Sequence, residues 1–552
     1  MSNIKDFVIT DGILRKYTGN DRNVTIPSSV TSIGDFAFHE CKIITAVTIP
    51  DGVTSIGFHA FCGCGNLVAV TIPRSVTKIG GGAFWGCTGL ASITLPDGLT
   101  NIGDYTFYGC THLTDVTIPK GVTGIGDFAF CECTSLSSVF LPDSVTRMGK
   151  NAFRHCKKLT GITIPGGVTS IGDYTFYECT HLTDVVIPKG VTGIGDFAFC
   201  KCTSLSSVFL PDSVTRMGKN AFRHCKKLTG ITIPDGVTHI GNGAFHGCTG
   251  LTRVCIPDSV TSMGKNTFER CSGLATVTIS GSVTCIDDDI FHGCTKLTHI
   301  AIPNGVTRIG NGAFHGCTGL TGIAIPDGVT SIGSSAFKKC KNIAAVTIPD
   351  SVTNIGKHAF AGCTDLTDIT LSGNLESIGK HTFAGCSSLT NITIPDSITK
   401  IGDAAFKGCS NLIGIAIPDS AASIGKHAFS GCTGLATITM PKHMARIGGC
   451  AFRNCKSLTR ITIPDGICYI SGSVFRNCES LTGVTVPESV THIYGCAFMG
   501  CISLASIALT NRVRCIGNDA FSDCKKLTVC ATDGSCTEQY AKEYGIPFLV
   551  TM

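Results

Sequence analysis

The chain has 552 residues, of which 66 are Gly, 33 are Cys, 30 are Phe and only 1 is Trp, and 15% are charged. A count of 44 Lys and Arg against 39 Asp and Glu leaves a formal charge of +5, far below the charge density of a typical nucleic-acid binder. Because 43% of the residues are apolar and glycine has no three-residue period, disorder and a collagen helix are both excluded.

The amino-terminal sequence MSNIKDFVIT lacks the basic segment and apolar run of a secretory signal. No run of about 18 apolar residues occurs anywhere, so we expect no membrane insertion. Thirty-three cysteines without an export signal favour a reducing compartment. The sequence therefore favours a cytoplasmic location, with the cell surface or unconventional secretion as the alternative.

Residues 1–26 are predicted to form an amino-terminal cap that resembles a β-hairpin. The apolar residues Phe7, Val8 and Ile9 come before Asp11-Gly12, a dipeptide typical of tight hairpin turns, and Ile13 and Leu14 follow it.

An array of 22 repeats of equal length is predicted over residues 27–532. From Pro27 to Pro487 proline recurs with a 23-residue period, except at Ser280 and Ser372, and Thr510 takes this place in the last repeat. Counting the proline as position 1, position 12 is Phe and position 15 is Cys in all 22 repeats. Repeats this short cannot bury an apolar face alone, so they must stack on one another.

The repeat that begins at Pro73 illustrates the predicted core. Ile79 points inward from an extended piece, Gly80 permits a tight corner, and Phe84 and Cys87 face the core from a stretch long enough for one helical turn. Leu90 then begins the next L-x-x-I-x-I strand, whose copies stack into a parallel sheet. The cysteine column is interpreted as a set of small buried hydrophobes.

Two neighbouring segments of the array are near-copies. Residues 104–172 and 173–241 are identical at 64 of 69 positions, which indicates that the array grew by duplication of three repeats. Duplication of repeats lengthens the surface of the array, and it does not create a single pocket of unique residues.

Residues 533–552 are predicted to form a carboxy-terminal cap made of a short helix and a strand. Ser535 is a suitable N-cap for a helix that runs through Glu538 and Ala541, and Gly545 and Pro547 end it. Both ends of a solenoid need such covers, because each would otherwise expose the core of one repeat.

The spacing L-x-x-I-x-I is that of leucine-rich repeats, and the 23-residue form with I-P, I-G-x-x-A-F and C-x-x-L resembles the BspA-like (Treponema-type) leucine-rich-repeat family over residues 24–532. This resemblance implies a repeat solenoid, a curved superhelix with a parallel β-sheet on the concave face and short helical turns or strands on the convex side. It also implies an adhesin-like binding function toward proteins or host surfaces.

We expect the functional residues at the outward-facing positions of the concave sheet whose residue type differs from repeat to repeat. Position 22 carries an apolar stripe made of Phe140, Val186 and Phe209, and exposed aromatics on a sheet are typical of interface hot spots. Inheritance from one ancestral repeat explains the two phenylalanines equally well. Position 20 supplies the polar candidates, namely Asp115, Asp184, Arg253, His299, Asp368, Asn391 and Arg460. The leading hypothesis is a non-enzymatic protein that binds a protein partner or a cell-surface macromolecule, and no nucleic acid.

Two alternatives stay open. Thr347, Thr370 and Thr393 at position 22 form a threonine ladder suited to glycans or ordered water, although β-propensity alone also explains it. The run Asp287–Asp289, near His292 and His299, offers oxygen ligands for a cation or a catalytic site, although a degenerate turn with solvated charges is the simpler interpretation. No phosphate-binding loop or nucleophile elbow occurs, so we expect no enzyme, no catalytic residues, no metal and no cofactor.

Overall fold

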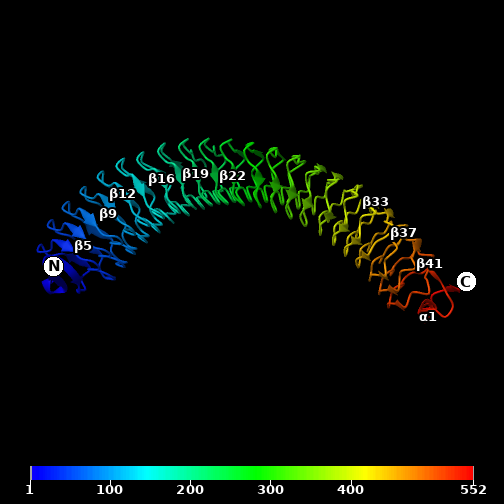
Figure 1. The fold of residues 1–552 in the computed structure, drawn as a ribbon. Helices are drawn as coiled ribbons and strands as arrows, with labels where there is room; N and C mark the ends of the chain where they lie inside the picture. The colour runs from blue at the N-terminus through cyan, green and yellow to red at the C-terminus, as the bar shows by residue number, and fades with distance from the viewer. Residues whose placement is uncertain (1–2, 551–552) are drawn as a thin grey trace. The chain divides into compact units, whose positions relative to one another are not determined.

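The computed structural model describes residues 3–550 and divides into two compact units, Met1–Ser282 and Val283–Met552. Each unit is a regular stack of 23-residue coils, one per repeat (Figure 1). Strands of two to five residues supply nearly all the regular structure, and the strands of successive coils pair in parallel. The structure thus confirms the predicted repeat solenoid of the leucine-rich-repeat type.

The amino-terminal end begins with the 3₁₀ turn η1 (Ile4–Asp6) and the antiparallel hairpin of β1 (Phe7–Thr10) and β2 (Ile13–Tyr17). The hairpin joins the stack because β2 pairs in parallel with β4 (Ser32–Ile33). Tyr17 places its ring 5.3 Å from that of Phe38, the first phenylalanine of the array. The hairpin therefore covers the open end of the core.

Each coil has three sides. One side carries the L-x-x-I-x-I segments, whose strands pair from one repeat to the next, and we call it the long-strand ladder. Its strands in the first unit are β3 (Asn23–Thr25), β5 (Ala46–Thr48), β7 (Ala69–Thr71), β9 (Ser92–Thr94), β11 (Asp115–Thr117), β13 (Ser138–Phe140), β15 (Gly161–Thr163), β17 (Asp184–Val186), β21 (Arg253–Cys255) and β23 (Thr276–Thr278). Those in the second unit are β25 (His299–Ile300), β28 (Ala345–Thr347), β30 (Asp368–Thr370), β33 (Gly414–Ala416), β35 (Thr437–Thr439), β37 (Arg460–Thr462), β39 (Gly483–Thr485), β41 (Ser506–Ala508) and β43 (Thr528–Ala531).

The second side is the short-strand ladder, made of two-residue strands at positions 6 and 7. In the first unit it contains, after β4, the strands β6 (Ser55–Ile56), β8 (Lys78–Ile79), β10 (Asn101–Ile102), β12 (Gly124–Ile125), β14 (Arg147–Met148), β16 (Ser170–Ile171), β18 (Gly193–Ile194), β19 (Arg216–Met217), β20 (His239–Ile240) and β22 (Ser262–Met263). In the second unit it contains β24 (Cys285–Ile286), β26 (Arg308–Ile309), β27 (Ser331–Ile332), β29 (Asn354–Ile355), β31 (Ser377–Ile378), β32 (Lys400–Ile401), β34 (Ser423–Ile424), β36 (Arg446–Ile447), β38 (Tyr469–Ile470), β40 (His492–Ile493) and β42 (Cys515–Ile516).

The third side, positions 9–15, differs from the single helical turn expected there. Positions 10 and 14 have positive φ, as at Phe36 (57°) and Glu40 (58°), so the backbone forms successive reverse turns. The amides of these turns donate alternately within their own coil and to the next coil. That of Cys41 donates within the coil to the Phe38 carbonyl (3.1 Å), whereas that of Phe38 donates to the Ala60 carbonyl of the next coil (2.7 Å). We call this side the turn ladder.

The sequence predicts that the glycine at position 8 provides the backbone freedom for a tight corner. In the structure, this glycine instead lets the backbones of adjacent coils approach each other closely. A Cβ atom on Gly80 would lie 2.6 Å from the backbone of Gly57 and Phe58 in the preceding coil, and Gly126 and Gly149 are equally close to their neighbours. Most repeats have glycine here because a side chain would meet the preceding coil, whereas Asp287, Ser471 and Tyr494 show that the corner can adjust to a larger residue.

The core repeats from coil to coil as predicted. Ile79 is 6% exposed, and Phe84, Cys87 and Leu90 are fully buried. The phenylalanines of position 12 stack with their rings nearly parallel, with centroids 5.3 Å apart between Phe61 and Phe84, for example. Each buried phenylalanine stabilises the stack by roughly 1.5–3 kcal/mol.

The carboxy-terminal end is closed by α1 (Cys536–Glu543) and β44 (Phe548–Val550), and β44 pairs in parallel with β43. As predicted, Ser535 is the N-cap, and its hydroxyl accepts the amide of Glu538 (3.3 Å). Tyr540 sets its ring at 67° to that of Phe521, the last phenylalanine of the array. An aromatic ring therefore covers the phenylalanine column at this end also.

Within residues 3–550, no helix has the length and apolarity that a membrane span requires.

Candidate binding surface

The predicted apolar stripe lies on the long-strand ladder of the first unit and is open to solvent. Phe140, Val186 and Phe209 are 69%, 60% and 67% exposed. A parallel bridge joins Val186 to Phe209, so these two side chains are neighbours on adjacent coils. Phe140 lies two coils before Val186, with Thr163 of β15 between them. The structure therefore arranges the stripe as one apolar pair and one separate phenylalanine.

The long-strand ladder loosens directly after this stripe. Residues 207–209 and 230–232 form no regular strands and keep only the single bridges Val186–Phe209 and Gly230–Arg253. Gly230 has no side chain, and a Cβ atom there would meet nothing within 4 Å. A shallow groove of about 1180 Å³ lies over these coils.

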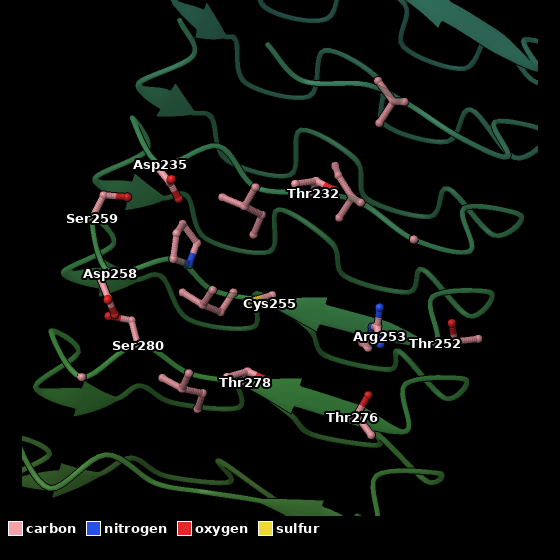
Figure 2. A pocket seen from close by; sticks show the side chains of 18 of the residues that line it. Thr232, Asp235, Thr252, Arg253, Cys255, Asp258, Ser259, Thr276, Thr278 and Ser280 are labelled. Atoms are coloured by element: carbon pink, nitrogen blue, oxygen red, sulfur yellow. The ribbon is translucent and has the colours of Figure 1, made fainter. Parts of the chain in front are cut away.

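Three groups of side chains line the groove (Figure 2). Thr232, Cys255 and Thr278 form a row along its middle, all at position 22 and all exposed. Arg253 lies to one side of this row, and Asp235 lies across it at the opposite edge. The groove thus offers hydroxyls, a thiol and charges of both signs beside an apolar pair.

The other position-20 candidates of the first unit, Asp115 and Asp184, are exposed on β11 and β17. Each carboxylate accepts a hydrogen bond from the preceding threonine, Thr114 at 3.2 Å and Thr183 at 3.0 Å. Each of these hydroxyls also donates to a carbonyl of the coil before it. These acidic groups are therefore held in place and remain open to a partner.

The remaining candidates belong to the second unit. His299, Asp368 and Arg460 are exposed on β25, β30 and β37, and Asn391 is exposed on a segment without strand pairing. Arg460 lines a groove of about 550 Å³ together with Lys442, His443 and Asp465. This unit therefore has its own groove on the long-strand ladder.

The threonine ladder is only partly regular. Thr347 of β28 pairs directly with Thr370 of β30, and both are exposed. Thr393 lies in a segment that forms no strand, so the lattice does not continue through it.

The run Asp287–Asp289 is built into the coil contacts. The Arg308 guanidinium bridges Asp287 (2.9 Å) and Asp288 (3.6 Å), and the amide of Asn311 donates to Asp288 (2.8 Å). Asp289 occupies a left-handed turn position, with φ of 54°. Among residues 3–550, no three His, Cys, Asp or Glu side chains are grouped to hold a metal ion. Arg308 thus forms ion pairs with two of the three aspartates.

The core thiols are hydrogen-bond donors. Cys64 donates to the Phe38 carbonyl at 3.0 Å, and the same contact recurs at 3.0–3.2 Å from coil to coil within each unit. Burial raises the pKa of Cys64 to about 12, so the thiol stays protonated at neutral pH. Most of this column therefore lies in the core, whereas Cys41 and Cys524 at its two ends are only half-buried.

An aromatic row on the turn ladder was missed by the sequence analysis. Trp85 stacks on Tyr105 (5.1 Å), Tyr105 stacks on Phe128 (4.8 Å), and Phe36 stacks on His59 (5.3 Å). All except Trp85, at position 13, occupy position 10, which in the first unit is aromatic or histidine in the first, second, fourth, fifth, seventh and eighth repeats. Because the rings cover each other's faces, the row mainly supports the stack.

These features define a leucine-rich-repeat solenoid whose long-strand ladder is exposed to solvent. The BspA type leucine rich repeat region matches in six overlapping copies, at residues 15–122, 100–229, 169–298, 216–342, 284–413 and 399–528. The chain therefore belongs to the BspA-type leucine-rich-repeat family.

Solved structures of bacterial leucine-rich-repeat proteins are similar to the chain. A protein from Bacteroides ovatus is 25% identical over 88% of this chain and 97% of its own, with a TM-score of 0.39. A leucine-rich cell surface protein from Faecalibacterium prausnitzii is 30% identical over 78% and 92%, with a TM-score of 0.25. One from T. pallidum is 27% identical over 37% and 90%, with a TM-score of 0.28. A comparison with curated proteins gives no match.

Proposed function

We propose that the chain is a non-enzymatic, adhesin-like protein that binds a protein partner or a cell-surface macromolecule on the long-strand ladder of its first unit. The observation that carries this proposal is the exposed pair Val186 and Phe209 next to the groove at Arg253. Large aromatic side chains beside an arginine are the residues that most often dominate binding energy at interfaces.

The surroundings of this pair support the same function. The groove is open and shallow, which suits an extended polymer better than a small substrate that must be enclosed. Hydroxyl groups of Thr232 and Thr278 line its floor, and Asp235 lies opposite Arg253. Protein interfaces combine apolar and polar groups in this way, and here the polar groove lies beside the apolar pair.

The test uses Cys255 as an attachment point for a photo-crosslinker. Cys255 is exposed in the groove, and Cys468 and Cys515, the other exposed cysteines, are first changed to Ser. The labelled protein is incubated with extracts and surfaces of candidate host cells, and the crosslinked partner is identified by mass spectrometry.

The double variant Phe140→Ala/Phe209→Ala should then reduce the affinity for that partner at least tenfold, because truncating a hot-spot aromatic costs about 2 kcal/mol or more. Phe58→Ala is the matched control, since Phe58 is also exposed (55%) but lies at position 9, outside the long-strand ladder. Equal affinity of the double variant and the control would contradict the proposal.

A further inference from the structure

The turn ladder of the second unit carries a dense row of basic residues. In positions 9–16 of six consecutive coils, from Ser334 to Lys456, there are nine Lys or Arg residues and one acidic residue, Asp403. We call these nine residues the basic strip, which consists of Lys338, Lys339, Lys341, Lys357, Lys380, Lys407, Lys426, Arg453 and Lys456.

Backbone hydrogen bonds hold the strip in register. The amide of Ser335 donates to the Lys357 carbonyl (2.8 Å), that of His358 to Lys380 (3.0 Å), and that of Ala404 to Lys426 (2.8 Å). Beneath them, the phenylalanine rings advance by 5.2–5.8 Å per coil. The strip therefore presents at least one cation per coil over five such steps.

Most of this charge has no acidic partner within the described part of the chain. Only Lys456 of the strip forms an ion pair, with Glu479 at 2.9 Å, and Asp403 accepts the backbone amide of Lys426. The turn ladder of the first unit is different, since its Lys150 pairs with Asp173 (3.5 Å) and its Lys201 pairs with Glu178. The first unit thus intersperses acidic residues among its turn-ladder cations, whereas positions 9–16 of the six coils of the strip hold only Asp403.

Three histidines, His358, His381 and His427, lie among the cations of the strip. His358 and His381 stack with ring centroids 4.7 Å apart. Burial lowers the pKa of His358, and His381 and the neighbouring lysines lower it further. Burial, Lys407 and Arg453 likewise lower the pKa of His427, against the opposing effect of Asp403. An anion on the strip would relieve this repulsion.

The surface of the strip limits what the anion can be. Small residues such as Ala384, Gly385 and Gly408 lie between the cations, so little side-chain bulk separates one cation from the next. Phe, Tyr and Trp are absent from its outward positions 9, 10, 13 and 14, and His358 and His381 occupy each other's faces. Single-stranded nucleic acids are bound mainly on aromatic platforms, which are absent from the strip.

The cation type and spacing favour a polysaccharide. Eight of the nine cations are lysines, whose point charges suit many weak contacts better than the forked recognition of one phosphate that arginine provides. The advance per coil is close to the length of one sugar ring in an extended polysaccharide. We propose that the basic strip binds a linear sulfated polysaccharide. Lys357 and Lys380 of position 9 would face successive anionic groups, and Lys426, which lies beyond Asp403 at the same position, would face a later one.

This site is separate from the partner surface proposed above, because it lies on the turn ladder of the other unit. The test measures binding of a fluorescent heparin dodecasaccharide by anisotropy over a series of NaCl concentrations. Wild-type protein should bind with an affinity that falls steeply and linearly on logarithmic axes as salt rises, since each contact releases counterions.

The variant Lys357→Gln/Lys380→Gln/Lys407→Gln/Lys426→Gln should lose at least tenfold in affinity at low salt and show a shallower salt slope. The control Lys400→Gln/Lys442→Gln/Lys525→Gln/Lys526→Gln removes the same charge from the same unit outside the strip, and it should keep most of the affinity. Circular dichroism of both variants checks that the stack is intact.

Three results would overturn the proposal. These are no binding by the wild-type protein, equal losses in both variants, or tighter binding of a charge-matched single-stranded oligonucleotide than of the dodecasaccharide. Phe140→Ala/Phe209→Ala should leave polysaccharide binding unchanged, so failure of the partner surface and failure of the basic strip are distinguishable.

Discussion

The thiol at position 15 has two roles in the coils that follow the first. It fills a small apolar space, and it donates a hydrogen bond to the carbonyl of the phenylalanine in the preceding coil, as Cys87 does to Phe61 (3.1 Å). A methyl group in this place would fill part of the space and leave the carbonyl with its local turn contact alone. Sulfur chemistry is thus used here as a directional contact between coils.

Alkylation should separate the cysteines into two classes. At pH 7.5 iodoacetamide should modify the exposed Cys255, Cys468 and Cys515 within minutes, whereas core thiols such as Cys64, whose pKa is raised to about 12, should react only on unfolding. Peptide mapping by mass spectrometry measures this difference. Modification of all 33 cysteines in denaturant is the control, and rapid labelling of Cys64 in native protein would contradict the buried ladder.

The two copies of the duplicated segment show how single residues tune one fold. Two of their five differences, Gly109/Glu178 and Glu132/Lys201, create a new ion pair, because Glu178 and Lys201 both occupy position 14 of adjacent coils. A third, Thr117/Val186, creates the apolar neighbour of Phe209. Register alone places these pairs side by side, so both contacts could have been predicted from the sequence.

At the scale of the element, the turn ladder depends on side chains that cap the backbone of the next coil. Asp127 accepts the amide of Lys150 (2.8 Å), and its own amide donates to Asp104 (2.7 Å). Asp196 makes the same contact with Lys219 in the second copy (2.8 Å). An Asp or Asn at position 9 therefore links successive coils where the turns provide no strand pairing.

Replacing Asp127 by Ala should destabilise its coil locally by about 1 kcal/mol, because the amide of Lys150 loses its acceptor. Asp127→Asn should restore most of the protection, since an amide oxygen also accepts. Hydrogen exchange read on peptides that extend to Gly166 or Asp235 distinguishes the two copies. The Asp196 copy is the internal control, and faster exchange in both copies would indicate a global effect instead.

The stacked histidines should make the second unit sensitive to acid. His292 and His315 stack with centroids 4.6 Å apart, and burial, His292 and the lysines at 338 and 339 lower the pKa of His315 to about 4. Unfolded histidine has a pKa of about 6.5, so the unfolded state binds more protons between these values. Stability is therefore expected to be unaffected above about pH 6.5 and to fall as the pH drops toward 4.

Thermal melts at pH 7 and pH 5 test this expectation. His315→Gln should lose less stability between the two values than wild type, because it removes the group that resists protonation. His299→Gln is the control, since His299 is exposed on β25. The same loss in all three proteins would show that His315 is not responsible.

At the scale of the whole molecule, the single repeat is the unit of stability. Deleting residues 173–241 joins Gly172 at position 8 to Asn242 at position 9 and removes three complete coils. Every ladder remains in register, so the shortened protein should fold and melt within a few degrees of wild type.

Deleting residues 173–183 removes eleven residues instead and shifts the phenylalanine, cysteine and glycine columns of all later coils relative to the earlier ones. This protein should lose cooperative folding at the junction. Circular dichroism melts and limited proteolysis compare the two deletions. A stable eleven-residue deletion would show that register matters less than the stacked columns indicate.

The fold was predictable because its decisive contacts repeat. Phe at position 12 and Leu at position 18 indicate the same buried positions in nearly every coil. The two caps are recognised from local motifs, the hairpin turn Asp11-Gly12 and the helix N-cap Ser535. The exposure of Phe140 and Phe209 followed from position as well. The groove did not, because residues 207–209 and 230–232 lack regular strands although they have the same residues as 138–140 and 161–163, which form β13 and β15.

The direction of the hydrogen bonds gives the molecule a mechanical property. Contacts such as Phe38 to Ala60 join each coil to the next, so a pull on the two ends loads them lengthwise, one coil at a time. A released 23-residue coil adds roughly 70–80 Å of extended chain. Stretched from its ends, such a chain would lengthen in equal steps under nearly constant tension and dissipate a sudden load gradually.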